Sequence, residues 1–169
     1  FCMFSCPKCG EVHLITKKCN SPICPSCGRR YTELWSKSLV DRLLPVAHRH
    51  WIFTIPDILW AYTERDRTLL RTLLDSVIET MRMMMSRIRR TAAKHKEVEP
   101  GVICVLHTYG SDIKWNSHVH CIITEGGLTK EENRKWMDVR FIPFDQLRIL
   151  WRDVVLRKFQ NNMPRTKEV

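Results

Sequence analysis

Two matching pairs of cysteines near the start of the chain constrain its folding more than any other feature. The segments CPKCG, with Cys6 and Cys9, and CPSCG, with Cys24 and Cys27, form a C-x2-C-x14-C-x2-C pattern. Two such turns can direct four thiolates at one tetrahedral Zn²⁺, and the glycine after each pair lets the backbone bend around the ion. Because sulfur fills all four positions, we expect a closed, structural zinc site. Cys19 is the reserve ligand, since its x4 spacing to Cys24 suits a tight turn less well.

The rest of this segment favours a metal over disulfide bonds. Six of the eight cysteines lie in the first 27 residues, among prolines and glycines typical of turns and with little apolar periodicity. A metal must therefore replace a missing core there. The start of the chain lacks a signal-peptide pattern, and no apolar run is long enough to span a membrane, so clustered cysteines indicate an intracellular protein.

A strongly basic composition points to a polyanionic partner. The formal net charge is +10, and residues 1–50 carry eight lysines and arginines against three acidic residues. Each cation placed on a phosphate releases a counterion, so nucleic acid is the expected partner. The alternative is a solvated basic surface that aids solubility. Five cations around the cysteines are the candidate DNA contacts: Lys8, Lys17, Lys18, Arg29 and Arg30.

Hydrophobic periodicity after residue 30 predicts helices and strands in a mixed order. The long helix carries its apolar side chains at three- and four-residue spacing, with arginines on the other face that we expect to be solvated. The two middle strands, joined by a turn, make a plausible hairpin. The expected elements are a helix over 31–44, a strand over 50–55, a helix over 66–94, strands over 102–109 and 116–124, and a helix over 145–159.

Three histidines converge if this hairpin forms. His118 and His120 lie two residues apart on one strand, so their side chains point to the same face. A turn centred between Asp112 and Ile113 places His107 opposite His118, with Cβ atoms about 5 Å apart. An open site of three imidazoles suits a divalent cation that keeps positions for water and a phosphate oxygen. The alternative is a set of half-buried histidines bonded to the backbone.

With these motifs in order, the chain resembles the HUH (His-hydrophobic-His) endonuclease superfamily, and within it the rolling-circle insertion-sequence transposases that carry an N-terminal zinc-binding domain. The resemblance covers nearly the whole chain, from CPKCG and CNSPICPSCG through LLPVAHRHWIFTIP to GVICVLHTYGSDIKWNSHVHCIITEGGL. The HVH segment matches the metal motif of the family, and His107 resembles a third histidine of related relaxases. The resemblance implies an α+β fold, with a zinc-ribbon DNA-binding domain over 1–45 and a ferredoxin-like antiparallel sheet flanked by helices over 46–169.

The resemblance also implies an activity. His107, His118 and His120 would hold a catalytic Mg²⁺ or Mn²⁺, and a tyrosine would attack a DNA phosphate to form a covalent 5′-phosphotyrosine link. Such a link conserves bond energy, so strands can be cleaved and rejoined without ATP. The implied partner is single-stranded DNA at transposon ends, and the implied location is the prokaryotic cytoplasm, at the nucleoid, with no membrane.

The tyrosines depart from the family pattern. The family places its nucleophile on a helix after the HVH strand, but Tyr31, Tyr62 and Tyr109 all precede it. Because the chain begins at Phe1, we expect it to be a fragment whose catalytic tyrosine lies further downstream, with Tyr109 as the alternative nucleophile. Two other functions stay open: a non-enzymatic zinc-ribbon DNA-binding module, and a plasmid rolling-circle replication initiator, which the zinc ribbon disfavours.

Overall fold

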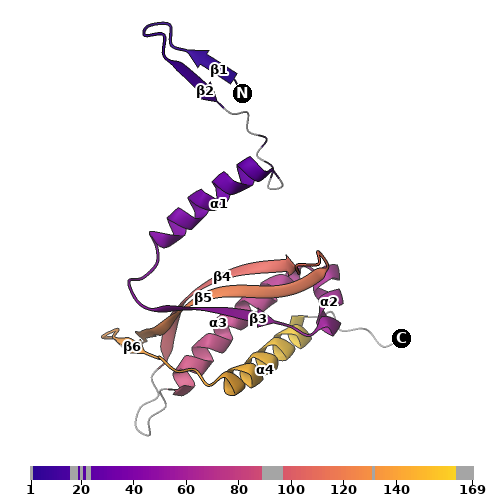
Figure 1. Ribbon diagram of the computed structural model, residues 1–169. Helices are drawn as coiled ribbons and strands as arrows, with labels where there is room; N and C mark the ends of the chain where they lie inside the picture. Colours follow the sequence, from indigo (N-terminus) through magenta and orange to yellow (C-terminus); the bar gives the residue numbers. More distant parts are fainter. Residues whose placement is uncertain are drawn as a thin grey trace. The chain divides into compact units, whose positions relative to one another are not determined.

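The computed structural model describes residues 2–15, 19, 21, 24–88, 97–130 and 132–162. It divides into two compact units, Phe1–Pro45 and Val46–Val169. Figure 1 shows helices and antiparallel sheets in the described parts. The predicted α+β class is therefore confirmed.

The first unit contains one hairpin and one helix. β1 (Cys2–Ser5) pairs antiparallel with β2 (Val12–Ile15), and α1 spans Pro25–Val40. The predicted helix over 31–44 therefore begins earlier, inside the second cysteine pair, and ends earlier. Proline has a fixed φ and no N–H to donate, which suits the first turn of a helix, so Pro25 can open α1. No residue of α1 is buried, so its apolar side chains do not build a core.

The second unit is built on an antiparallel sheet. Its strands are β3 (His48–Thr54), β4 (Val98–Tyr109), β5 (Trp115–Thr129) and β6 (Trp136–Asp138). The order is β3-β5-β4, and β6 pairs with the far part of β5. β5 is therefore the central strand, and its side chains have neighbours on both sides.

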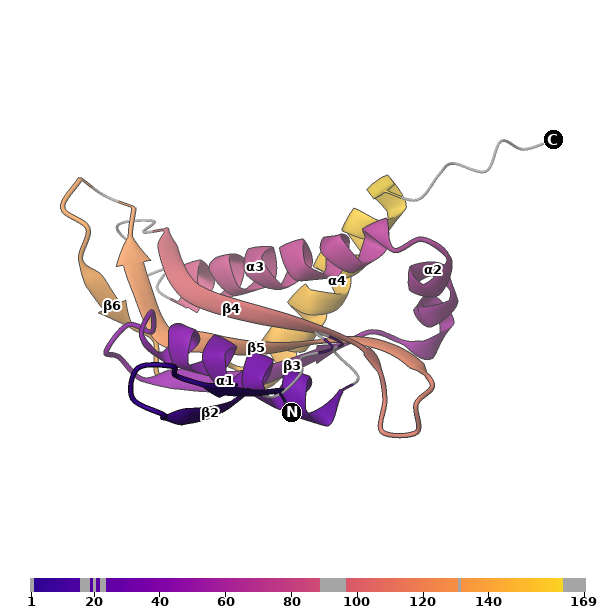
Figure 2. The same cartoon turned by 90° about the horizontal axis from the view of Figure 1, so that it is seen from above.

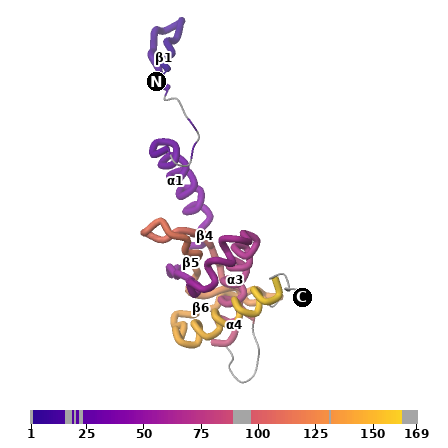
Figure 3. The backbone as a smooth tube through the Cα atoms, turned by 90° about the vertical axis from the view of Figure 1, so that its right-hand side faces the viewer, coloured from indigo at the N-terminus to yellow at the C-terminus, as the bar shows by residue number. Residues whose placement is uncertain are grey.

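Helices cover one face of this sheet. A short 3-10 turn (Asp57–Leu59) leads into α2 (Trp60–Arg65) and α3 (Thr68–Ile88), and α4 (Phe144–Asn162) follows the sheet. α3 and α4 lie on the same side of the strands (Figure 2) and run next to each other (Figure 3). The predicted helix over 66–94 is observed as far as Ile88, because residues 89–94 lie outside the described part.

Alternation along the central strand separates the core from the opposite face. Val119, Cys121 and Ile123 of β5 are at most 1% exposed and belong to a core that α3 and α4 complete. His118 and His120 alternate with them and point away from that core, because successive side chains of a strand face opposite sides. The part of the second unit that the structure describes places no helix over this second face (Figure 2).

The hairpin register is the one that the sequence predicts. His107 of β4 pairs with His118 of β5, and the strands extend beyond the predicted ends. Ile113 adopts a left-handed φ of 63° in the turn. The register shifts by one residue between His107 and Tyr109, so Tyr109 pairs with Trp115.

Candidate metal and nucleic-acid sites

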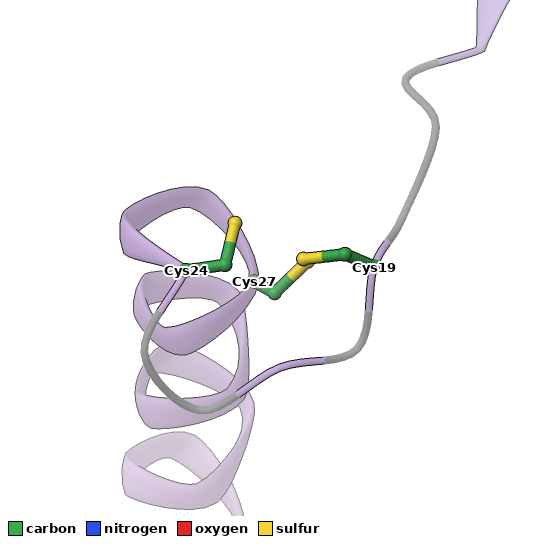
Figure 4. A group of neighbouring side chains, drawn as sticks. All are labelled: Cys19, Cys24 and Cys27. Carbon is green, nitrogen blue, oxygen red and sulfur yellow. The ribbon is translucent and has the colours of Figure 1, made fainter.

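Three cysteines converge at the start of α1. The sulfur atoms of Cys19, Cys24 and Cys27 all lie within 4.8 Å of one another. Figure 4 shows Cys24 and Cys27 on the first turn of the helix and Cys19 on the segment before it. The sulfurs of Cys19 and Cys27 are 3.7 Å apart. The reserve ligand of the sequence prediction thus joins the second predicted pair.

The position of Cys24 at the start of α1 lowers the pKa of its thiol. Cys24 is the N-cap of α1. The backbone N–H of Cys27, the neighbouring thiols and the N–H of Ser26 lower the pKa of Cys24 to about 7. A thiolate is the form that binds zinc, so a lowered pKa at a helix N-terminus favours a metal ligand. Three converging sulfurs are also the donors that Zn²⁺ prefers, so the donor set fits this ion.

The first predicted pair lies in the β1–β2 turn. The backbone N–H groups of Cys9 and Lys8, together with the Cys9 thiol, lower the pKa of Cys6. The backbone N–H of Cys6 bonds the carbonyl of Glu11 at 2.8 Å and closes the turn. Cys6 and Cys9 form a second thiol pair, but neither belongs to the group of three around Cys24.

The predicted DNA contacts in the first unit are exposed where they are described. Lys8, Arg29 and Arg30 are all exposed. Arg29 forms an ion pair with Glu33, one helical turn further along α1, at 2.7 Å. Lys17 and Lys18 lie outside the described residues. Lys8 and Arg30 are therefore accessible from the solvent, and their role as DNA contacts stays a prediction.

The three predicted histidines form one cluster on the uncovered face of the sheet. Each of His107, His118 and His120 offers a ring nitrogen, and these nitrogens lie within 4.8 Å of one another. The ring centroid of His107 is 5.3 Å from that of His118 and 4.3 Å from that of His120. A metal bound by imidazole lies about 2.0–2.1 Å from each nitrogen, so nitrogens this close together can share one divalent ion.

A hydrogen bond at His118 and burial at His120 favour the states of these two rings that can bind a metal. Nδ1 of His118 is 2.7 Å from the carbonyl of Asn116 and must donate to it, which leaves Nε2 with a free lone pair. Burial, and then the neighbouring histidines, lower the pKa of His120. A lowered pKa favours the neutral imidazole, which is the form that coordinates a metal.

A buried polar contact fixes the start of the histidine strand. The hydroxyls of Thr63 on α2 and Ser117 on β5 are 2.7 Å apart, and both residues are fully buried. The indole N–H of Trp115 also donates to the Thr63 hydroxyl, at 3.1 Å. These bonds tie α2 to the residue before His118, so the site rests on a rigid support.

A fourth histidine, which the sequence prediction missed, touches this cluster. His50 of β3 stacks on His120 with ring centroids 5.2 Å apart, and His50 Nε2 lies 3.1 Å from His120 Nδ1. His48-Arg49-His50 repeats the His-x-His spacing and ends on the first residue of the strand predicted over 50–55. This repeat was the available signal, but strand order, which sequence alone did not give, decides whether the two pairs meet.

The described tyrosines lie outside β5, the strand that carries His118 and His120. The ring of Tyr109 packs edge-on against Trp115, with centroids 5.5 Å apart, beyond the register shift that follows His107. Tyr62 lies on α2, and Tyr31 belongs to the first unit. The three imidazoles contact one another, and His120 also contacts His50.

Comparison with known proteins identifies the family. The description "Transposase zinc-binding domain" matches residues 1–55, which include every cysteine of the first unit. The description "Putative transposase" matches residues 101–169, which include the histidine hairpin. The chain belongs to the insertion-sequence transposases. Both predicted sites thus lie in segments that the family shares, and the presence of a zinc-binding domain follows.

Two curated relatives are similar over most of this chain. The transposase for insertion sequence element IS801 of Pseudomonas savastanoi pv. phaseolicola is 33% identical over 137 residues, 81% of this chain and 30% of the relative. A protein named "Putative transposase y4qJ" from Sinorhizobium fredii is 26% identical over 160 residues, 92% of this chain and 39% of that protein. The chain therefore spans about a third of the relatives' length.

The other comparisons add two limits. No solved structure gives a significant match. Within the described residues, every helix is too short or too polar to cross a membrane.

Proposed function

We propose that this chain provides the DNA-gripping and ion-binding parts of a rolling-circle transposase, which cleaves and rejoins single-stranded DNA at transposon ends. The observation that carries the proposal is the meeting of His107, His118 and His120 on the uncovered face of the sheet. A polyanionic strand can reach this face, and the formal charge of +10 attracts it. The family makes a DNA substrate the expected one.

The chain's own residues have defined parts in this reaction. His118 and His120, held by the central strand, and His107, held opposite, present imidazole lone pairs on one side. These three residues would hold a Mg²⁺ or Mn²⁺, which would supply positive charge to offset that of the scissile phosphate. The Asn116 carbonyl keeps His118 in the tautomer whose Nε2 is free. The sheet thus positions a phosphate, and another group must attack it.

The attacking group in this proposal is a tyrosine outside the 169 residues. Its oxygen bonds to phosphorus as the bond to the 3′ oxygen breaks, and the 3′ oxygen leaves with a proton. The product is a 5′-phosphotyrosine link, which a 3′ hydroxyl can later reverse. The packing of Tyr109 against Trp115 supports a nucleophile elsewhere, as does the length of the relatives.

Titration with diamagnetic Mg²⁺ tests the ion site in this chain. The imidazole resonances of His107, His118 and His120 should shift together, and those of His13 in the first unit should stay. Unmoved resonances of all three would remove the basis for the catalytic assignment. In the whole transposase, His118→Ala should abolish formation of a covalent DNA adduct with a single-stranded oligonucleotide.

For the first unit we propose a structural zinc ion and a role in gripping DNA. Cys6, Cys9, Cys24 and Cys27 form the proposed ligand set, with Cys19 as the replacement for one member. The convergence of Cys19 with Cys24 and Cys27 supports that replacement. Lys8, Arg30 and the other basic residues around the zinc site would contact the phosphate backbone, so binding should weaken steeply with salt.

The second candidate function is a non-enzymatic DNA-binding module. It is favoured by the position of Tyr31, Tyr62 and Tyr109, which all precede His118 in the sequence. It requires that the double variant His118→Ala/His120→Ala keep its salt-sensitive affinity for DNA. Loss of most of that affinity would count against the module. A plasmid replication initiator would share the chemistry, but both curated relatives are named as a transposase or a putative transposase.

A further inference from the structure

The contact between His50 and His120 has the geometry of a hydrogen bond between two imidazoles. His50 Nε2 and His120 Nδ1 are 3.1 Å apart. A neutral imidazole carries one N–H and one bare nitrogen, so one of these two atoms must donate to the other. His50 does not belong to the group whose nitrogens lie within 4.8 Å of one another. It therefore contacts a predicted ligand without being one.

Ion binding would fix the direction of this bond. Nδ1 of His120 faces His50, so His120 offers Nε2 to the cluster. When the lone pair of Nε2 binds a cation, the proton of a neutral ring must be on Nδ1. That Nδ1–H can only donate, and His50 Nε2 accepts. Metal-binding histidines commonly donate their second N–H in this way, which fixes the tautomer and the ring orientation.

The strand on which His50 lies is well anchored. Ile52, two residues after His50, pairs with His120, so His50 is the diagonal neighbour of His120. Arg49, on the opposite face, bonds Glu125 at 2.6 Å and the Arg140 carbonyl at 3.2 Å. Because Arg49 is held on one face of β3, the next residue, His50, points to the other face, where the histidine cluster lies. His50 is exposed, so it loses little packing when it is replaced.

We propose that His50 is a positioning residue for the histidine site. It accepts the Nδ1–H of His120 and so holds the Nε2 of His120 toward the divalent ion. This inference rests on the proposed function, because it assigns a partner to one of the three proposed ligands. A ring that loses this acceptor can rotate or change tautomer, and ion affinity falls.

Three variants test the role with Mn²⁺ as the probe. Changes to such partners typically cost about 10–100-fold in metal affinity, which is the loss expected for His50→Ala. His50→Gln should retain most of the affinity and His50→Asn less, because the amide oxygen of glutamine reaches the position of Nε2. His48→Ala is the matched control, on the same strand with the same spacing, and should bind Mn²⁺ as the unchanged chain does.

Nitrogen NMR of the imidazoles separates positioning from mere structural support. Before Mn²⁺ is added to the zinc-loaded chain, His50→Ala should shift the His120 Nδ1 resonance, and His48→Ala should leave it in place. Unchanged His120 nitrogens, or Mn²⁺ affinity of His50→Ala within about twofold of the original, would overturn the role of His50. If the unchanged chain binds no Mn²⁺, the proposed function fails. The spectra recorded without Mn²⁺ still decide whether His50 orients His120.

Discussion

The two units of the chain are held together in opposite ways. In the first unit, every described residue of β1, β2 and α1 is at least partly exposed, and Phe4 and Leu34 are 58% and 60% exposed. In the second, α3 and α4 bury a continuous core that includes Leu73 and Phe159. We therefore expect the first unit to need zinc-bound cysteines in order to fold. We expect the second unit to fold without an ion, because its core is apolar and buried.

Removal of zinc should produce the largest difference between the units. Zinc binding to small domains is worth about 10–16 kcal/mol of apparent free energy, and this binding energy is also folding energy. A strong chelator should therefore collapse the amide dispersion of residues 2–15 and 24–40 and leave the second unit unchanged. Retained dispersion in the first unit without zinc would contradict this comparison.

Matched truncations should then show which unit has an apolar core. Leu73 on α3 is 1% exposed, and Leu→Ala at such a site costs about 2–5 kcal/mol of unfolding free energy. Leu34 on α1 is mostly exposed, and its replacement by alanine should change stability by less than about 0.5 kcal/mol. Denaturant unfolding of the zinc-loaded protein measures both. Equal costs would mean that α1 packs into a core after all.

Replacement of Cys19 should sharpen the description of the zinc site. If Cys19 binds the ion with Cys24 and Cys27, Cys19→Ser should weaken zinc binding by about tenfold or more. Cys2→Ser, in the same unit, is the control and should have no effect. Competition with a zinc-binding dye gives both affinities. An unchanged affinity in Cys19→Ser would favour the original set with Cys6 and Cys9.

The smallest effects are expected from the removal of two ion pairs, one between α3 and α4 and one within α1. Burial raises the pKa of Glu79, but Lys158, at 3.0 Å, and Arg157 lower it more, and these contacts join α3 to α4. Because the folded pKa is depressed, this stabilisation is present above the unfolded pKa and is lost as pH falls through the folded value.

Glu79→Gln should therefore cost about 0.5–1 kcal/mol near pH 7 and little at pH 3, since the pair is partly exposed. Glu33→Gln removes the pair within α1 and should cost about 0.3 kcal/mol or less. Unfolding curves at both pH values make the comparison. A cost for Glu79→Gln that stays constant with pH would exclude the ion pair as its cause.

The sequence predicted those features that depend on neighbours along the chain. Alternation placed His118 and His120 on one face, and a short turn set His107 opposite His118; both rules are local. The contact between His50 and His120 joins residues 70 apart in the sequence, and its prediction required the strand order β3-β5-β4. Whether Cys19 lies close to Cys24 and Cys27 depends on where α1 begins. The helix begins at Pro25, earlier than the predicted start at residue 31.

The central claim is that the second unit carries a divalent-ion site formed by its three histidines, separate from the zinc. An Mn²⁺ titration of the zinc-loaded chain, followed by electron paramagnetic resonance, tests it directly. We expect one bound Mn²⁺ per chain, lost in His118→Ala/His120→Ala, with zinc content and the melting transition of the second unit retained. Mn²⁺ binding that survives in the double variant, or is absent from the unchanged chain, would contradict it.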